Sequence, residues 1–406
     1  MCIRDRSKLR YPGKWNARPH DAAGMAEWLS YTFERPLNWQ IIDADSPVAE
    51  ASDAPILYIS GAGPFELTNE QVARLRTFAL RGGLILSEAA CNNGAFTRDM
   101  QRLCRRMFPE FPFRRLGDDH PLYRAYYTPE GVGGLFGVDN GVRLLVVHSP
   151  KEMSLAFQLR SPRTRRATYD LLTNVYVLAT DRGKLLPRGA RRWPAAAPFG
   201  AEGPAATIRV ARIRHEGNCD PEPLAWRRLS NVLSRRHRIR LEVTSPIDPA
   251  NLNARTHPVA AMTGTESFTL SEPQTDALRK YLADGGTLVI DAAGSSKDFA
   301  ASVEKHVFPL VGDAKALPIP FAHPLYLKGP ERIERVSYRR ETALRLGGAK
   351  NQPRLVGVRD GKRYTVIFSR DDLTAGLCGY EYLGLRGYKP ESASRLMTNI
   401  LWYASR

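Results

Sequence analysis

The sequence has few cysteines, and no two of them lie close together. There are five among 406 residues, with no C-x-x-C pair: Cys2, Cys91, Cys104, Cys219 and Cys378. An odd number of scattered cysteines argues against a disulfide framework and against a cysteine-rich zinc site. We therefore expect no disulfide-stabilised fold, no metal centre and no bound cofactor.

The sequence also lacks a long apolar run. No stretch approaches the roughly 18 apolar residues that a membrane-spanning helix needs. The start, MCIRDRSKLRYPG, lacks the apolar core of a signal peptide, and the first plausible strand follows at 8–11. The letters MCIRDR are typical of a translated sequencing artefact, so we expect an incomplete N-terminus. The compartment stays open between periplasmic or membrane-associated and, alternatively, cytoplasmic.

Negative charge is scarce relative to positive charge. The chain has 42 acidic residues against 59 lysines and arginines, for a formal net charge of +17. Arginine is concentrated in two runs, 160–166 (RSPRTRR) and 235–240 (RRHRIR). These runs favour binding of an anionic polymer, or are arginines on a solvated surface. Because no helix-turn-helix, zinc finger or aromatic RNA-binding motif accompanies them, nucleic acid is not the partner we expect.

Two long stretches of the chain resemble each other. The sequence ISGAGPFELTNEQVARLRTFALRGGLILSEAAC begins at residue 59, and MTGTESFTLSEPQTDALRKYLADGGTLVIDAAG begins 203 residues later. An HPLY motif also recurs after 203 residues. A period this long predicts two homologous domains and not a solenoid. We place the domains at 7–185 and 207–406, joined by a linker rich in Pro, Ala and Gly at 186–206.

Each repeat alternates strands with helices. The first contains an apolar strand at 56–60, a helix capped by Thr68 and Gln71, and a strand at 84–87. The second repeat follows the same order, with its helix capped by Ser271. Apolar strands that alternate with helices form parallel sheets with helices on both faces. The sequence therefore predicts an α/β fold with two three-layer domains.

Five segments occur in an order that identifies a family. They are RYPGKWN, SGAGPFELT, GGLILSEAACN, DHPLY and VVHSPKE. Together they resemble the bacterial family named domain of unknown function 4159, present here as two tandem copies over nearly the whole chain. The resemblance implies a flavodoxin-like fold similar to class I glutamine amidotransferases, with mainly parallel sheets, and it implies no activity. It also implies a protein partner in a membrane system with MoxR-type ATPases and von Willebrand factor A proteins.

Three residues of the first repeat are candidates for a catalytic triad. Cys91 follows a strand and precedes a helix expected to begin near Thr97, and such a turn exposes a nucleophile to the helix N–H groups. The amidotransferase resemblance implies a cysteine on a turn of this kind. It also implies a histidine and a glutamate after a later strand, where His148 and Glu152 stand.

The second repeat lacks all three candidate catalytic residues. It has Gly294, Phe368 and Asp372 at the corresponding positions. A duplicated scaffold whose site residues have drifted favours a non-catalytic binding or assembly module, which is our leading hypothesis. The first alternative is a cysteine-dependent hydrolase or amidotransferase that uses the first repeat only. The second alternative is the binding of an anionic polymer through the arginine runs.

Four residues at strand ends are candidates for ligand binding. Gly61 and Gly63 lie in a segment that resembles the glycine-rich oxyanion loop of amidotransferases. Glu88 and Asp291 occupy corresponding strand ends, where a carboxylate is able to bind a ligand. One carboxylate without a second acid or a histidine is a weak metal signal, so we expect no metal there.

Histidines and aromatic residues supply further candidates. His120 and His323 recur in both repeats, either as ligands or as residues whose imidazole caps backbone groups beside a proline. Tyr11, Trp15 and Trp28 lie near the start of the first repeat. They either line a cleft for a sugar or peptide or belong to packed core.

Overall fold

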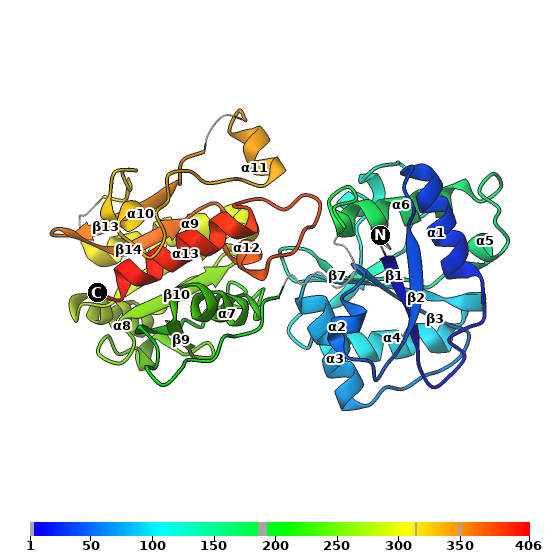
Figure 1. Cartoon of the computed structure of the whole chain (residues 1–406), viewed down its shortest axis with the longest axis horizontal. Helices are drawn as coiled ribbons and strands as arrows, with labels where there is room; N and C mark the ends of the chain where they lie inside the picture. Colours follow the sequence, from blue (N-terminus) through cyan, green and yellow to red (C-terminus); the bar gives the residue numbers. More distant parts are fainter. Residues whose placement is uncertain (1–3, 186–192, 313–314, 349–350) are drawn as a thin grey trace. The chain divides into compact units, whose positions relative to one another are not determined.

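The computed structural model describes residues 4–185, 193–312, 315–348 and 351–406. It contains two α/β units, each built on its own seven-stranded sheet (Figure 1). One unit comprises Met1–Arg191 with Glu381–Gly384, and the other comprises Arg192–Tyr380 with Leu385–Arg406. The predicted α/β fold with two mainly parallel sheets is confirmed.

The first sheet has the strand order β2-β1-β3-β4-β7-β6-β5. Its strands are β1 (Arg4–Arg10), β2 (Asn38–Asp43), β3 (Ile56–Gly61), β4 (Leu84–Ala89), β5 (Phe113–Arg115), β6 (Phe136–Asp139) and β7 (Leu144–Ser149). Strands β2, β1, β3, β4 and β7 are parallel, whereas β6 and β5 extend one side as antiparallel neighbours. Because parallel strands end at the same edge, the loops that follow β1, β3, β4 and β7 meet there.

The second sheet repeats this plan with the order β9-β8-β10-β11-β14-β13-β12. Its strands are β8 (Ala206–Arg212), β9 (Ile239–Val243), β10 (Val259–Gly264), β11 (Thr287–Ala292), β12 (Leu317–Pro318), β13 (Leu355–Asp360) and β14 (Arg363–Ser369). The five parallel strands and the two antiparallel ones occupy the same places as in the first sheet. Equivalent residues of the two units can therefore be compared by their strand register.

Helices cover both faces of the first sheet (Figure 1). On one face lie α1 (Asp21–Thr32), α5 (Ser154–Gln158) and α6 (Arg166–Thr180), and on the other lie α2 (Val48–Ala51), α3 (Asn69–Leu80) and α4 (Gly94–Met107). Two short helical turns complete the unit, η1 (Ala90–Asn92) and η2 (Pro121–Arg124). The apolar strands are thus shielded from water on both sides, as the sequence pattern predicts.

The second unit has equivalent helices. They are α7 (Ala225–His237), α8 (Glu272–Ala283), α9 (Lys297–His306), α10 (Pro324–Leu327), α11 (Arg340–Arg345), α12 (Thr374–Cys378) and α13 (Pro390–Ala404), with the turns η3 (Pro249–Asn251), η4 (Ala293–Ser295) and η5 (Phe308–Val311). Helices α7, α12 and α13 pack against one another, as α1, α5 and α6 do in the first unit. None of the helices in the described ranges combines the length and apolar character needed to cross a membrane.

Helix capping follows the sequence closely. Both predicted capping boxes form, Thr68 with Gln71 on α3 and Ser271 with Gln274 on α8. The helix expected near Thr97 begins three residues earlier, because the Asn93 side chain accepts a hydrogen bond from the N–H of Phe96 and caps α4 there. That position sets the turn that carries Cys91.

The predicted linker at 186–206 lies partly outside the described residues, because 186–192 are not described. Its later part packs on the second unit: Asn231 donates a hydrogen bond to the carbonyl of Pro194, and the N–H of Ala197 donates to Ser234. The domain boundaries themselves remain predictions.

Strand β1 begins at Arg4, earlier than the predicted strand at 8–11, and it buries an ion pair. Asp5 and Arg6 are fully buried, and the guanidinium donates to the carboxylate. Burial raises the pKa of Asp5, whose Oδ1 has no hydrogen-bond partner among the described residues. In the second unit, Val210 occupies the register position of Arg6, since each pairs with the first residue of the neighbouring strand.

We predict that the double variant Asp5→Ala/Arg6→Val stabilises the first unit. Replacing a buried ion pair with apolar residues is often neutral or stabilising by about 1–4 kcal/mol, because neither charge then has to be desolvated. The single variant Arg6→Val leaves Asp5 buried without its partner and is expected to destabilise by about 3–5 kcal/mol. Thermal unfolding of both variants measures the difference, and a double variant as unstable as the single one would show that the pair stabilises the fold.

Candidate functional site

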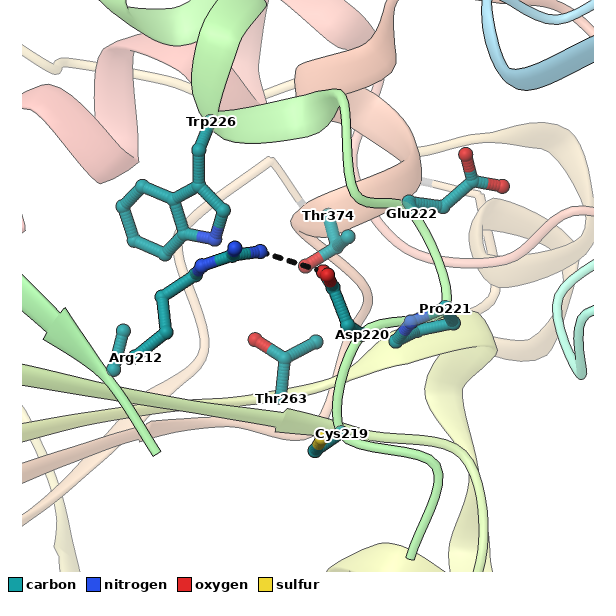
Figure 2. Close-up of a pocket in the computed structure, with 9 residues that line it drawn as sticks. Arg212, Cys219, Asp220, Pro221, Glu222, Trp226, Thr263 and Thr374 are labelled. Carbon is teal, nitrogen blue, oxygen red and sulfur yellow. Dashed lines mark hydrogen bonds and ion pairs between the residues drawn. The ribbon is translucent and has the colours of Figure 1, made fainter. Parts of the chain in front are cut away.

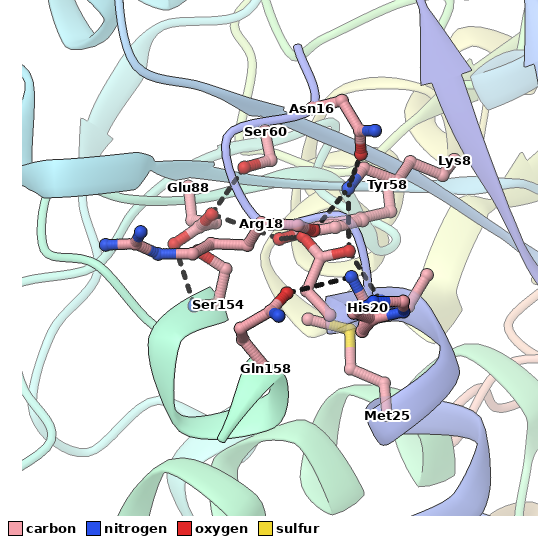
Figure 3. Close-up of polar contacts among 12 residues, drawn as sticks. Lys8, Asn16, Arg18, His20, Met25, Tyr58, Ser60, Glu88, Ser154 and Gln158 are labelled. Carbon is pink, nitrogen blue, oxygen red and sulfur yellow. Dashed lines mark hydrogen bonds and ion pairs between the residues drawn. The ribbon is translucent and has the colours of Figure 1, made fainter. Parts of the chain in front are cut away.

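Glu88 lies at the carboxyl end of β4, at the edge where ligands usually bind in such folds (Figure 3). It is fully buried. Its Oε1 accepts hydrogen bonds from the hydroxyls of Tyr58 and Ser60, and its Oε2 accepts from the N–H groups of Met153, at 2.7 Å, and Ser154, at 3.2 Å. Both oxygens are therefore used inside the protein, and the loop after β7 is fastened to β4.

The same network reaches the start of α1 (Figure 3). The Tyr58 hydroxyl lies 3.0 Å from Glu88 and 3.1 Å from Asp21, so its single proton is shared between two carboxylates. Burial, followed by the charges of Glu88 and Asp21, raises the pKa of Tyr58 well above its usual value. The ammonium of Lys8 donates to Asp21 at 2.6 Å and also to Asn16. This chain of contacts fixes the first turn of α1.

The second unit has an equivalent attachment at Asp291, the fifth residue of β11 as Glu88 is the fifth of β4. Its carboxylate accepts hydrogen bonds from the N–H groups of Leu373, at 3.0 Å, and Thr374, at 2.8 Å, and from the Thr374 hydroxyl. Two carboxylates of different length therefore hold the same loop in both units. This contact accounts for their presence in both repeats without a ligand.

Asp372 of the second unit stands at the position of Glu152. It is fully buried and accepts hydrogen bonds from the N–H groups of Gly294 and Ala375. Burial raises the pKa of Asp291, and burial together with the charge of Asp291 raises the pKa of Asp372. Asp291 and Asp372 are both buried, so neither carboxylate is open to a ligand.

A small cavity distinguishes the second unit at this edge. Ala261 is the third residue of β10, where the first unit has Tyr58 as the third residue of β3. Ala261 lines a small pocket here, whose empty space, open solvent included, is about 260 Å³. Figure 2 shows the side chains around it, with the Arg212 guanidinium 2.7 Å from Asp220 and the hydroxyls of Thr263 and Thr374 nearby.

Cys91 lies on the turn η1 between β4 and α4, and its side chain is exposed. Its backbone is left-handed, with φ of 56°. The equivalent Gly294 has φ of 63°, so the turn has the same shape with or without a thiol. The guanidinium of Arg18 lies 3.7 Å from Sγ of Cys91 and 2.9 Å from the Glu152 carboxylate. Cys91 and Glu152 therefore both contact the guanidinium of Arg18.

His148 is on β7, and its side chain lies between β4 and α4 inside the first unit. Its Nδ1 is 3.1 Å from the Ser87 hydroxyl, and its Nε2 is 3.2 Å from the Thr97 hydroxyl. The residue is completely buried, and burial lowers the pKa of His148 to about 4. Both ring nitrogens are engaged by hydroxyls, and the ring is neutral near pH 7. The structure thus separates the role of His148 from that of Cys91 and Glu152.

Gly61 and Gly63 differ in their surroundings. A Cβ at Gly61 would lie 2.3 Å from the Tyr11 hydroxyl and 2.5 Å from the Phe96 ring, so close packing requires glycine. A Cβ at Gly63 would lie 3.4 Å from the Lys14 side chain, an ordinary contact. Tyr11 itself donates to the carbonyl of Ser60, and it belongs to the core.

The two recurrent histidines cap short helical turns. The Nδ1 of His120 accepts a hydrogen bond from the N–H of Leu122, and the Nδ1 of His323 accepts from the N–H of Leu325. Burial lowers the pKa of both His120 and His323, which favours the neutral ring that accepts these bonds. The capping alternative described from the sequence is the one that the geometry matches.

An aromatic–arginine groove in the first unit was missed by the sequence analysis, although Trp28 and the run 160–166 were both noted. We define it by the side chains of Trp28, Tyr31, Tyr169, Arg160, Arg163 and Arg166. It is an open groove between α1 and the segment leading into α6, and the empty space there, solvent included, is about 1,330 Å³. The sequence feature that could have predicted the groove was the pair Trp28 and Tyr31, one helical turn apart, together with an arginine run distant in the sequence.

The groove combines open rings with cations. Tyr31 is 79% exposed, and its ring centre lies 6.3 Å from that of Trp28. Arg166 lies 5.5 Å above the Trp28 ring and is ion-paired with Asp170. Arg160 is paired with Glu27 at 2.6 Å. Within the described residues, Arg163 is exposed and has no acidic partner within ion-pair distance.

No cluster of three or more metal-ligating side chains occurs in the part of the chain that the structure describes. The candidate site therefore consists of the closed network at the strand ends, the exposed Cys91 beside Arg18, and the aromatic–arginine groove.

Comparison with known proteins gives a family and remote structural likenesses. A family model described as domain of unknown function (DUF4159) matches residues 7–184 and again 209–405. No curated protein matches the sequence. A structure described as a ThuA-like protein from Bacteroides uniformis aligns with 51% of this chain and 94% of its own, at 14% identity and a TM-score of 0.27.

Two further structures align over a larger share of the chain. One is described as a phosphosugar isomerase from Silicibacter pomeroyi, with 71% of this chain and 75% of that one covered, 9% identity and a TM-score of 0.18. The other is 3-phosphoglycerate dehydrogenase from Entamoeba histolytica, with 74% and 85% covered, 10% identity and a TM-score of 0.17. Likenesses this remote carry no argument about function.

We predict that Glu88→Gln destabilises the first unit by about 2–3 kcal/mol, because an amide nitrogen cannot accept the hydrogen bonds that one carboxylate oxygen now accepts. Glu66→Gln, the same change at an exposed position, is the control and is expected to be neutral. Thermal unfolding is the measurement. Unchanged stability of Glu88→Gln would indicate a carboxylate available to a ligand.

His148 is expected to make the first unit sensitive to acid. Because its pKa in the folded state, about 4, is below the ordinary value of 6.5, the unfolded chain binds the proton more tightly. The full contribution of the neutral His148 ring to the free energy of unfolding is present above about pH 6.5. It falls by roughly 3 kcal/mol as the pH drops to about 4.

The variant His148→Phe carries the residue that the second unit has at this position, Phe368. We expect it to flatten the pH dependence of first-unit unfolding between about pH 6.5 and 4, measured by denaturant titration at several pH values. Burial also lowers the pKa of His215 in the second unit to about 4, so the pH dependence of second-unit unfolding is expected to be the same with and without the substitution. An unchanged pH profile would exclude His148 as the titrating group.

Proposed function

We propose that this chain, which belongs to the DUF4159 family and contains two copies of its domain, is a non-catalytic binding or assembly module. The observation that carries this proposal is the pair of loop attachments at Glu88 and Asp291. In both units these carboxylates at the strand ends form hydrogen bonds with the protein's own loops. What the two repeats share is thus a scaffold and not a reactive centre.

The surface that supports binding is the aromatic–arginine groove. The sequence hypothesis placed the ligand or protein partner either at the strand ends or on the surface between the two repeats. The closed network at the strand ends favours a site on the α1 and α6 side of the first unit. Open aromatic rings beside cations are the kind of surface that contacts a ligand, since they expose apolar area and charge together. The domain division at 7–185, 186–206 and 207–406 is part of this proposal.

A second candidate function rests on Cys91. Its exposed sulfur lies on a left-handed turn between a strand and a helix, 3.7 Å from a guanidinium, where a nucleophile would be open to a substrate. This is the geometry that an amidotransferase-like hydrolase using the first unit would need. The position of His148 counts against the predicted triad of Cys91, His148 and Glu152, because its nitrogens are engaged elsewhere.

The rate of Cys91 alkylation distinguishes the two functions. The intact protein is treated with iodoacetamide at about pH 6, with Cys91→Ser as the control for the other cysteines and glutathione as the reference thiol. The binding module predicts labelling no faster than the reference. Labelling faster on the order of tenfold, and lowered by Arg18→Gln, would indicate an activated nucleophile and overturn the non-catalytic function.

A further inference from the structure

We propose that the aromatic–arginine groove binds a nucleoside phosphate, either as a free nucleotide or as a unit of a single strand. The inference rests on the binding function proposed above and gives that function a ligand class. From the sequence we did not expect a nucleic-acid partner, because no known binding motif is present. That expectation did not take the groove into account, because its residues are distant in the sequence.

The cations of the groove suit a phosphate. Arg163 is exposed and has no acidic partner within the described ranges, so its guanidinium is available for two parallel hydrogen bonds to phosphate oxygens. Arg160 is held by Glu27 and Arg166 by Asp170, which fixes their positions on either side. With three guanidinium groups against the carboxylates of Glu27 and Asp170, the groove has one excess positive charge, on Arg163, and favours an anion.

The rings of the groove suit a flat base. Tyr31 presents most of its surface to solvent, and Trp28 beside it is tilted by 36°. Trp28 is anchored by a hydrogen bond from its Nε1 to Thr173, and Arg166 already lies over its ring. A base stacked on Tyr31 would extend this row of rings and guanidinium without moving the core.

The second unit lacks the aromatic part of this surface. Alignment of the buried faces of α1 and α7 sets Val232 at the position of Trp28 and Arg235 at the position of Tyr31. Two of the four arginines are ion-paired in each run, and those of the second run are Arg236 with Glu391 and Arg238 with Glu202. Charge exists on both units, but at these equivalent helix positions rings and charge meet in the first unit alone.

The test is fluorescence anisotropy of a labelled oligothymidylate of about ten nucleotides, titrated with the full chain at low salt. Unlabelled UMP, uridine, inorganic phosphate and polygalacturonate are the competitors. The variants are Tyr31→Ala and Arg163→Glu in the groove. Arg235→Glu is the matched control, because it is the same charge reversal at an exposed arginine outside the groove.

We expect Tyr31→Ala and Arg163→Glu each to weaken binding about tenfold, and Arg235→Glu to change it by less than about twofold. Competition by UMP as well as by the unlabelled strand identifies a free nucleotide as sufficient. Competition by the strand alone identifies the single strand. Either result supports a nucleoside phosphate.

Other results would overturn the proposal. Equal loss in all three variants would show general charge attraction, and phosphate competing as well as UMP would remove any role for the base. Stronger competition by polygalacturonate would identify an acidic polysaccharide. Absence of binding would refute the ligand class alone, because the alkylation rate of Cys91 tests the non-catalytic function separately.

Discussion

A buried carboxylate at the carboxyl end of β4 has to be satisfied by the protein itself, and the architecture of the first unit follows from that constraint. Water cannot solvate Glu88, so two hydroxyls and two backbone N–H groups do so. The loop after β7 is held at a fixed place, and with it the start of α5. Asp291 meets the same constraint with a shorter side chain, helped by the Thr374 hydroxyl.

The network also links the strand edge to the groove. Tyr58 joins Glu88 to Asp21, and Asp21 is the first residue of α1. Trp28 and Tyr31 lie further along that helix. A polar cluster that resembles an active site in sequence is therefore the foundation that positions the helix bearing the exposed rings. The scaffold can therefore keep its fold in both copies although the rings of Trp28 and Tyr31 are replaced by Val232 and Arg235 in the second.

Local signals in the sequence predicted much of the fold, because they depend on neighbours in the chain. The capping boxes at Thr68 and Ser271 and the repeat at 203 residues are signals of this kind. The start of β1 was missed because Asp5 and Arg6 are charged residues inside a sheet. The role of His148 could not be predicted, since its contacts with Ser87 and Thr97 depend on how β4 and α4 pack. The groove was missed for the same reason, because its halves are distant in sequence.

The replacement of Tyr58 by Ala261 has a consequence for the mechanical character of the two units. Unfolding removes internal void volume, and hydrostatic pressure favours whichever state occupies less space. Tyr58 is fully buried at its position in the first unit, whereas the second unit has a space beside Ala261 that is partly open to solvent. At this strand edge the second unit therefore has a small void on which pressure can act, and the first unit has an aromatic ring at the same position.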